Sequence, residues 1–534
     1  MASAGHGRTA LRTTAATAVS AALVAGGVVG LAPAAQAAQA AQAAPAAAPS
    51  VRFVDITGDG GTVLKANVVA PADASATHRY PLVVLPTSWS LPQVEYLAQA
   101  EKLADAGYVV LSYNVRGFWQ SGGQIEVAGP PDVADASKVI DWALAHTPAD
   151  PRHIGMAGVS YGAGISLLAA AHDRRIRAVA ALSGWADLVD SIYSGRTQHV
   201  QALAVLDGLG RLTGRESPEL RAMFQNLYSS NLSKEQEMIA WAKKRSPATY
   251  LDQLNRNGAA VMLANAWGDT IFNPNEYTAF YEKLKVPKRL ELRPGDHATA
   301  ELTGLFGLPN DVWTDTERWL GHYLKGADTG VDHEEPVRLK SRSAGEYEGY
   351  PDWKSVGATR EKIALAGSTT IHAGVDSGAD GGIVFLSSIL DQVAQLPPMA
   401  SIPLLPRRWA AVWQSPRRGT AQQVRGTASL HTTLTPTAES GTLVAYLYDV
   451  GPLGVGKLVT HAPYTWHGRT PGTPFDVDLD LFSTAYDVPA GHRLALVVDT
   501  ADPLYIEHNP SGAQLTFSSP SDDPSYVSVP VREQ

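Results

Sequence analysis

The strongest constraint on the fold is a five-residue junction, Gly-Val-Ser-Tyr-Gly at 158–162, which stands between two different patterns. An apolar strand pattern at 153–159 leads into it, and a small-residue helical pattern that includes Ile165 and Leu168 follows. Only residues without bulk beside the serine allow a strand and a helix to meet in so sharp a turn. Ser160 is therefore predicted to project above a sheet, at the N-terminus of a helix.

Short apolar strands and helical patterns alternate on both sides of this junction. We expect further strands at 52–56, 62–69, 81–85, 108–113, 176–182, 259–265 and 289–292, and helices at 94–106 and 132–145. Short buried strands that alternate with helices form a mostly parallel sheet covered on both faces. The sequence therefore predicts an α/β domain over residues 51–330.

A long insertion at 185–257 interrupts the alternation. Ser217 and Pro218 are typical of a helix start, and apolar residues then recur with helical spacing at Leu220, Met223, Phe224 and Leu227. Ser233 and Gln236 predict a capping box for a second helix. Because insertions after a central strand emerge at the ligand-binding edge of an open sheet, we expect a helical cap over a cleft. The alternative is that these helices only cover the sheet edge.

Residues 331–534 change to strand alternation, which is clearest at 443–450, 475–482 and 494–498. This pattern predicts a second, all-β domain of the sandwich or jelly-roll type. We expect the proline-rich stretch at 396–406 to be a surface insertion within it.

The N-terminus carries a targeting pattern. Arg8 and Arg12 precede an apolar run at 15–32, and small-residue steps follow up to Ala37 and Ala40. We expect a signal peptide at 1–37, a spacer at 38–50 and a secreted protein with no membrane association after cleavage. The alternative is a retained transmembrane anchor.

Composition narrows the chemistry. The formal net charge is −9, which argues against a nucleic-acid partner, and the chain contains no cysteine. A thiol nucleophile, a disulfide scaffold and a cysteine-ligated metal are therefore excluded. Because no nucleotide or zinc motif occurs in a suitable context, we expect no cofactor and no metal.

A serine nucleophile needs a base and an orienting acid, which follow it along the chain in this kind of fold. Asp269 comes just after the predicted strand at 259–265, and His297 follows the next strand. We therefore predict a Ser160, Asp269, His297 triad. Asp296 competes for the acid role, but it is adjacent to His297, and neighbouring side chains on an extended backbone diverge.

Acyl transfer also needs donors for the oxyanion. We expect one donor to be the backbone N–H of Tyr161, which follows the nucleophile. The second is predicted to be the backbone N–H of Trp89, in the loop after the strand at 81–85; the alternative is that Trp89 only forms a wall of the cleft.

These motifs, together with Tyr-Asn-Val-Arg-Gly at 113–117 and Pro-Gly-Asp-His at 294–297, resemble the X-Pro dipeptidyl-peptidase and cocaine-esterase (CocE/NonD) family of serine hydrolases. The resemblance covers nearly the whole mature chain. It implies an α/β-hydrolase domain with a helical cap, a C-terminal jelly roll and a triad at Ser160, Asp269 and His297. In the 113–117 motif, Arg116 is expected to be a buried ion-pair partner.

Two positions depart from the family pattern. The loop after the early strand contains no tyrosine to donate to the oxyanion, and Gly162 and Ala163 stand where amino-ester hydrolases carry a glutamate. We therefore expect a secreted hydrolase that acts on small-molecule ester or amide substrates. The alternatives are an X-Pro dipeptidyl-peptidase acting on peptides and, more distantly, a polymer-binding protein with an inert hydrolase domain.

Overall fold

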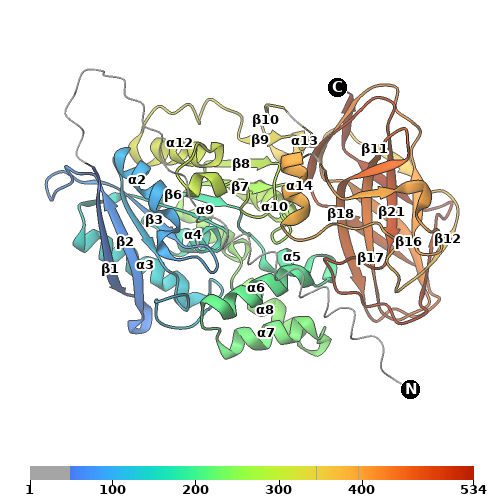
Figure 1. Cartoon of the computed structure of the whole chain (residues 1–534), viewed down its shortest axis with the longest axis horizontal. Helices are drawn as coiled ribbons and strands as arrows, with labels where there is room; N and C mark the ends of the chain where they lie inside the picture. Colours follow the sequence, from blue (N-terminus) through green and yellow to red (C-terminus); the bar gives the residue numbers. More distant parts are fainter. Residues whose placement is uncertain (1–47, 344, 395, 534) are drawn as a thin grey trace, which may run out of the picture.

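The computed structural model describes residues 48–343, 345–394 and 396–533, so the predicted signal peptide and most of the spacer lie outside the described residues. An α/β part and a β-rich part lie side by side, and a group of helices lies along one edge of the α/β part (Figure 1). No helix among the described residues is long and apolar enough to cross a membrane.

The α/β part is built on a ten-stranded sheet with the order β1-β2-β4-β3-β5-β6-β7-β8-β9-β10. Neighbouring strands from β4 to β9 pair in parallel, whereas β1, β2 and β10 pair antiparallel. The predicted α/β class is confirmed. The strands are β1 Ser50–Thr57, β2 Val63–Ala70, β3 Tyr80–Pro86, β4 Val109–Tyr113, β5 Ala149–Val159, β6 Ile176–Leu182, β7 Ala260–Ala266, β8 Lys288–Arg293, β9 Val337–Lys340 and β10 Tyr347–Tyr350.

The sheet extends beyond the expected domain boundary at residue 330. β9 and β10 lie after that boundary, yet β9 pairs with β8 in parallel and β10 pairs with β9. Each of these strands has only four residues. A strand of four residues is too short to show a clear periodicity. The sequence pattern therefore gave no sign that these strands belong to the α/β sheet, and the predicted boundary assigned them to the β domain.

Helices cover both faces of the sheet. Alternate residues of β3 point to opposite faces: Leu82 and Val84 join one buried cluster, and Val83 and Leu85 join another. The first cluster includes residues of α3, α4, α9 and α10, and the second includes residues of α2 and α12. The helices are α2 Leu97–Asp105, α3 Pro130–His146, α4 Tyr161–His172, α9 Leu251–Asn257, α10 Pro274–Lys283, α11 Leu302–Leu305 and α12 Asp311–Lys325.

Four further helices between β6 and β7 form the insertion, which we call the cap: α5 Leu188–Tyr193, α6 Val200–Thr213, α7 Pro218–Tyr228 and α8 Glu235–Lys243. α7 begins as predicted, because the Ser217 side chain accepts a hydrogen bond from the Leu220 N–H. The predicted capping box at Ser233 is wrong. A short 3-10 turn at Leu232–Lys234 displaces the start of α8 to Glu235, and the Ser233 hydroxyl donates to Asn231 instead.

The C-terminal part is a β domain of packed antiparallel sheets, as predicted. Its 396–406 stretch includes a short edge strand, β13, that pairs with β18, followed by a 3-10 turn. A helix that sequence analysis missed, α14 Leu386–Ala394, lies between the β domain and the α/β part (Figure 1). The strands are β11 Glu361–Ala364, β12 Thr369–His372, β13 Met399–Ser401, β14 Ala411–Gln414, β15 Gln422–Gly426, β16 Ser429–Pro436, β17 Gly441–Val450, β18 Val455–Trp466, β19 Phe475–Asp480, β20 Thr484–Val488, β21 Arg493–Asp499, β22 Gln514–Ser518, β23 Tyr526–Val529 and β24 Val531–Glu533, and a short helix, α13 Trp353–Val356, precedes them.

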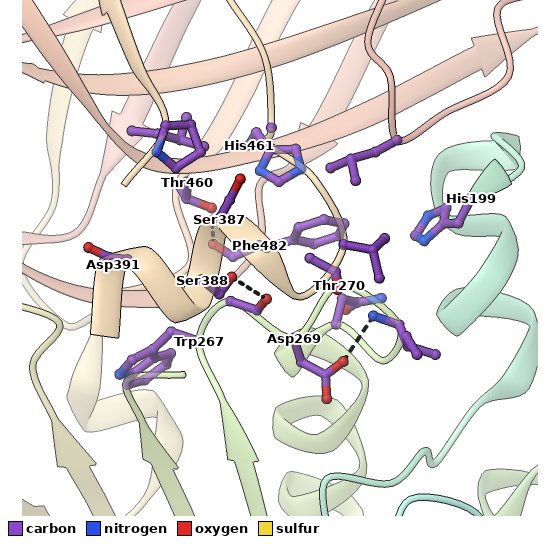
Figure 2. A pocket seen from close by; sticks show the side chains of 18 of the residues that line it. His199, Trp267, Asp269, Thr270, Ser387, Ser388, Asp391, Thr460, His461 and Phe482 are labelled. Carbon is purple, nitrogen blue, oxygen red and sulfur yellow. Dashed lines mark hydrogen bonds between the residues drawn. The ribbon is translucent and has the colours of Figure 1, made fainter. Parts of the chain in front are cut away.

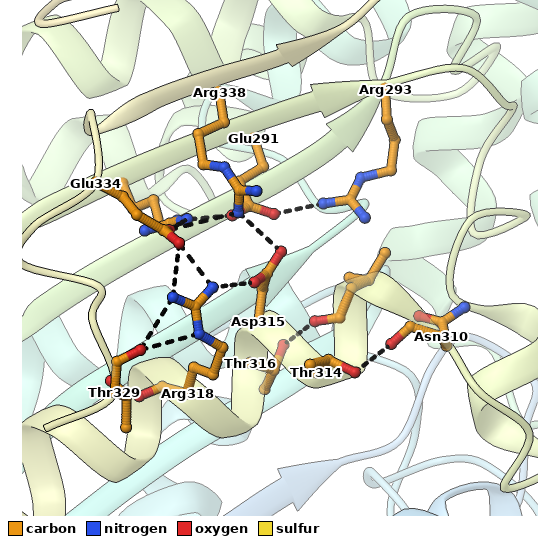
Figure 3. A network of polar contacts seen from close by, with 12 residues as sticks. Glu291, Arg293, Asn310, Thr314, Asp315, Thr316, Arg318, Thr329, Glu334 and Arg338 are labelled. Atoms are coloured by element: carbon orange, nitrogen blue, oxygen red, sulfur yellow. Dashed lines mark hydrogen bonds and ion pairs between the residues drawn. The ribbon is translucent and has the colours of Figure 1, made fainter. Parts of the chain in front are cut away.

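A buried ionic network fixes β8, the strand that leads to His297 (Figure 3). The fully buried Glu291 carboxylate accepts hydrogen bonds from Arg289 at 2.6 Å and from Arg293 at 2.5 Å. Arg338 of β9 donates to it at 3.2 Å and also to Asp315 of α12 at 3.1 Å. Burial alone would raise the pKa of Glu291, but the three surrounding arginines outweigh it and hold that pKa below its usual value. The network therefore joins two strands to a helix just before the loop that carries His297.

Candidate active site

Ser160 occupies a strained turn between β5 and α4. Its backbone has φ 56° and ψ −114°, outside the usual regions for a residue with a side chain. A Cβ on Gly158 would stand 2.6 Å from the backbone of Gly162, and one on Gly162 would overlap the carbonyl oxygen of Pro86. Both glycines are therefore required by the close approach of strand and helix, as the sequence predicted.

The three side chains predicted to form a triad lie together. The Ser160 Oγ is 2.8 Å from the His297 Nε2, and the His297 Nδ1 is 3.0 Å from the Asp269 Oδ2. The other oxygen of Asp269 accepts the backbone N–H groups of Ile271 at 2.9 Å and Phe272 at 2.8 Å, which fixes the carboxylate. Burial works against a charged imidazolium, but Asp269 and the other acidic groups nearby outweigh it and raise the pKa of His297.

The competing acid, Asp296, has a different partner set. Its Oδ1 accepts the backbone N–H of His297 at 2.6 Å, and the backbone N–H and hydroxyl of Thr270 at 2.8 and 2.7 Å. Burial, with a smaller contribution from Asp269, raises its pKa to about 6. Asp296 therefore braces the backbone of the histidine loop and makes no hydrogen bond to the imidazole ring.

The residues that carry the two predicted oxyanion donors line the same cavity as Ser160, and for Trp89 the alternative of a cleft wall predicts the same position. Tyr161 follows Ser160 at the first turn of α4. Within the described residues, neither the Tyr161 nor the Trp89 backbone N–H donates a hydrogen bond. The Tyr161 hydroxyl is engaged elsewhere, because it donates to Asp132 at 3.1 Å and accepts from the Ala128 N–H at 2.8 Å.

Glu95 supports the loop that carries Trp89, and sequence analysis did not single it out. Its carboxylate accepts the Ser88 N–H at 2.9 Å and the Ser88 hydroxyl at 2.5 Å. Burial raises the pKa of Glu95 to about 7. The sequence carries no distinctive signal for this role, because the predicted helix at 94–106 that contains Glu95 also contains Glu101 and Asp105.

The cavity at Ser160 is walled by apolar side chains and has a volume of about 50 Å³. The apolar face of α7 that the sequence predicted contributes to its wall, with Leu220, Met223, Phe224 and Leu227. The other walls come from α5, α6, α8 and the loops around the nucleophile. Among the described lining residues there is no aspartate or glutamate, so this cavity offers no carboxylate to a substrate ammonium.

A second cavity of about 60 Å³ lies behind the Asp269 loop, where the α/β part, the cap and the β domain meet (Figure 2). Ser388 of α14 closes one side by donating to the Gly268 carbonyl at 3.1 Å. His199 from the cap and His461 from the β domain also line it. Three separate parts of the chain therefore enclose the acid loop.

Arg116 plays the structural part expected of it. Its guanidinium donates two hydrogen bonds of 2.7 Å to the Asp135 carboxylate, and both side chains are buried. The ion-pair prediction is confirmed.

Two family models match adjoining parts of the chain. Residues 59–299 match the model described as X-Pro dipeptidyl-peptidase (S15 family), and residues 329–528 match the X-Pro dipeptidyl-peptidase C-terminal non-catalytic domain. The chain belongs to the X-Pro dipeptidyl-peptidase (S15) family. It is accordingly a serine hydrolase, and the polymer-binding hypothesis gains no support.

Similar proteins agree with this assignment. A putative Xaa-Pro dipeptidyl-peptidase of Streptomyces avermitilis is 22% identical over 495 residues, which cover 77% of this chain and 69% of the relative. An aminopeptidase from a marine sediment archaeon, Thaumarchaeota archaeon, superimposes with a TM-score of 0.70 at 13% identity, covering 94% of this chain and 99% of that one. A CocE/NonD family hydrolase from Staphylococcus aureus gives a TM-score of 0.65 at 12% identity, covering 91% and 94% of the two chains. At these identities the solved structures show the fold alone, an α/β-hydrolase domain followed by a β domain.

Proposed function

We propose that this S15 family member hydrolyses carboxylic esters with apolar acyl groups through Ser160, His297 and Asp269. The observation that carries the proposal is the 2.8 Å contact between Ser160 Oγ and His297 Nε2 at the floor of an apolar cavity. A hydroxyl in contact with an imidazole that is itself held by a carboxylate is the arrangement that activates a serine nucleophile.

In the proposed reaction, His297 Nε2 takes the Ser160 proton while Oγ forms a bond to the ester carbonyl carbon and the carbonyl electron pair moves onto its oxygen. The tetrahedral intermediate collapses, the bond to the leaving alcohol breaks, and His297 returns the proton to that alcohol. Water then loses a proton to His297 and attacks the acyl-enzyme, and Ser160 regains its proton as the acid leaves. Asp269 holds the required tautomer and stabilises the imidazolium.

The oxyanion in this scheme is stabilised by the backbone N–H groups of Tyr161 and Trp89. Support comes from Tyr161 following the nucleophile directly, from Trp89 lining the same cavity as Ser160, and from the lack of an acceptor for either N–H among the described residues. The Tyr161 donor also stands at the N-terminus of α4, where unpaired amides favour negative charge.

The second candidate function is an X-Pro dipeptidyl-peptidase. The two family models and the Streptomyces relative favour it at least as strongly as they favour an esterase. One observation argues against the peptidase. A dipeptidyl-peptidase must bind the ammonium group of its substrate, and the described residues that line the Ser160 cavity include no carboxylate.

One set of assays separates these functions. Purified protein is given p-nitrophenyl butanoate, an alanyl-proline p-nitroanilide with a free amine, and the N-acetylated form of that anilide. We expect turnover of the butanoate ester and no preference for the free amine. Preference for the free-amine anilide would instead establish the peptidase. Ser160→Ala should abolish turnover and labelling by a fluorophosphonate, and retained labelling would remove Ser160 as the nucleophile.

We also propose that the protein is secreted. The support is the basic, apolar and small-residue order at 1–37. Expression of the full chain should release protein into the medium with its N-terminus just after Ala37 or Ala40, as read by intact mass. Recovery of uncleaved protein in the membrane fraction would favour the retained anchor.

A further inference from the structure

The cap contains a second apolar cavity directly beyond the one at Ser160. This distal cavity has a volume of about 30 Å³ and lies between α5, α7 and α8. Five residues line both cavities: Leu188, Ile192, Met223, Leu227 and Trp241. A single layer of side chains therefore separates the two spaces.

Apart from the two backbone N–H groups proposed to bind the oxyanion, the polar atoms around the cavity at Ser160, which we call the proximal cavity, are almost all engaged. The indole N–H of Trp89 donates to the Leu206 carbonyl at 3.0 Å, and that of Trp185 donates to the Arg245 carbonyl at 2.8 Å. The third indole that lines this cavity belongs to Trp241, and its N–H is buried without a hydrogen-bond partner among the described residues. A ligand that enters past Ser160 consequently meets hydrocarbon, and burying apolar area is the main source of its binding energy.

The size of the proximal cavity favours a narrow ligand. Its volume of about 50 Å³ is well below the roughly 150 Å³ of an engineered cavity that holds benzene. The layer between the two cavities includes Met223, and methionine is unbranched and adapts its shape readily. A flexible chain can displace that side chain at low cost, whereas a rigid ring system cannot extend through the layer.

The far end of the distal cavity is not a charge-binding site. Glu235, which lines it, accepts hydrogen bonds from the Tyr193 hydroxyl at 2.8 Å and from Arg196 at 3.0 and 2.9 Å. Its negative charge is thereby paired. The remaining wall of this end, with Met238 and Ile239, is apolar.

We propose that the preferred acyl group is a linear aliphatic chain of medium length. Its first carbons occupy the cavity at Ser160, and its distal carbons pass Met223 and enter the distal cavity. The inference rests on the proposed function, because the chain is positioned by the ester carbonyl at Ser160.

The test is a series of p-nitrophenyl esters from acetate to dodecanoate, measured as kcat/KM on the full protein. Wild type should gain about fourfold per added methylene, equivalent to ~0.8 kcal/mol each, until the distal cavity is filled. Ile239 is half-buried and lines the distal cavity but not the proximal one, so Ile239→Trp should fill only the distal cavity. It should match wild type on acetate and butanoate and lose at least tenfold on the longest chains that wild type accepts.

Ala240→Trp is the matched control. Ala240 is the next residue of α8, is exposed and lines neither cavity, so this variant should follow wild type along the whole series. Met238→Trp supplies a second way to fill the distal cavity, should Ile239→Trp lower the melting temperature.

Two results would overturn the inference. One is that Met238→Trp and Ile239→Trp give the same kcat/KM as wild type at every chain length. The other is that the kcat/KM of wild type falls steadily for chains longer than acetate. Failure of the proposed function looks different. In that case wild type turns over none of the esters, acetate included, and does not differ from Ser160→Ala.

Discussion

The Asp269 carboxylate lies 3.0 Å from the His297 Nδ1, whereas Asp296, adjacent in sequence to the histidine, contacts only its backbone N–H. We therefore expect Asp269→Asn to reduce kcat by a factor on the order of 10⁴, as in the best-studied serine triad, because the amide favours the wrong tautomer. Steady-state kinetics on a butanoate ester provides the measurement. Asp296→Asn is the control and should have a much smaller effect; a larger loss there would transfer the acid role to Asp296.

The second prediction concerns Glu95 and the geometry of the oxyanion loop. The Ser88 carbonyl accepts the Leu91 N–H at 3.2 Å, and because the following peptide is planar and trans, the Trp89 N–H points away from that carbonyl. Glu95→Ala removes the acceptor of the Ser88 N–H and leaves the Ser88 hydroxyl with only the Val159 carbonyl at 3.0 Å, so it should lower kcat with little change in KM. We expect a loss of up to about 10², the lower end of what removing one oxyanion donor costs.

Glu95→Gln is the informative companion to that variant. The glutamine carbonyl can still accept the Ser88 N–H, while its amide donates to the Ser88 hydroxyl. Activity should therefore return to near the wild-type value. Equal losses in the glutamine and alanine variants would indicate that the loop does not depend on this hydrogen-bond pattern.

A third prediction follows from the histidines at the junction of the three parts (Figure 2). Burial lowers the pKa of both His199 and His461 to about 3, so both are neutral in the folded protein at pH 7. In the unfolded chain they titrate near 6.5, and the unfolded state binds more protons below that pH. The contribution of these two histidines to stability should thus be fully present above pH 6.5 and decline as the pH falls toward 3, by at most about 1.4 kcal/mol per pH unit for each histidine.

Melting temperatures from pH 8 to pH 4 provide the measurement. A variant with glutamine at both positions should show a flatter decline between pH 6.5 and 4 than wild type. If the two proteins decline in parallel over that interval, other groups must account for the acid sensitivity.

The fourth prediction concerns the network around Glu291 (Figure 3). Glu291→Gln leaves three arginines facing a neutral side chain in a buried site, and breaking a buried ion pair on one side typically costs about 3–5 kcal/mol. Chemical denaturation should show this loss. Glu335→Gln, at an exposed position nearby, is the control and should change stability by less than about 0.5 kcal/mol.

Much of the fold could be predicted from local pattern because the relevant interactions are local. The Gly-X-Ser-X-Gly junction dictates its own backbone, and short apolar runs mark the buried strands. The sequence therefore placed Ser160, Asp269 and His297 just after strands now seen as β5, β7 and β8, where their side chains lie within hydrogen-bonding distance. The apolar spacing of α7 likewise predicted its apolar face, and the structure shows that this face lines the cavity.

Elements that depend on distant contacts could not be predicted in this way. The strands β9 and β10 are stabilised by pairing with β8 and with each other, and the helix α14 follows Phe385, whose positive φ of 64° no local pattern indicates. The role of Glu95 depends on a hydrogen bond to a loop seven residues earlier, which a helical pattern does not report.

The side chains that would perform chemistry and those that would choose the acyl group come from different parts of the chain. Ser160, Asp269 and His297 stand at strand ends, whereas most of the proximal wall and all of the distal wall belong to the one insertion between β6 and β7. Substrate range in such a scaffold can diverge by exchange of a single contiguous segment while the reaction machinery stays fixed. A chimera that receives this segment from another family member should inherit the donor's acyl preference together with the recipient's catalytic rate.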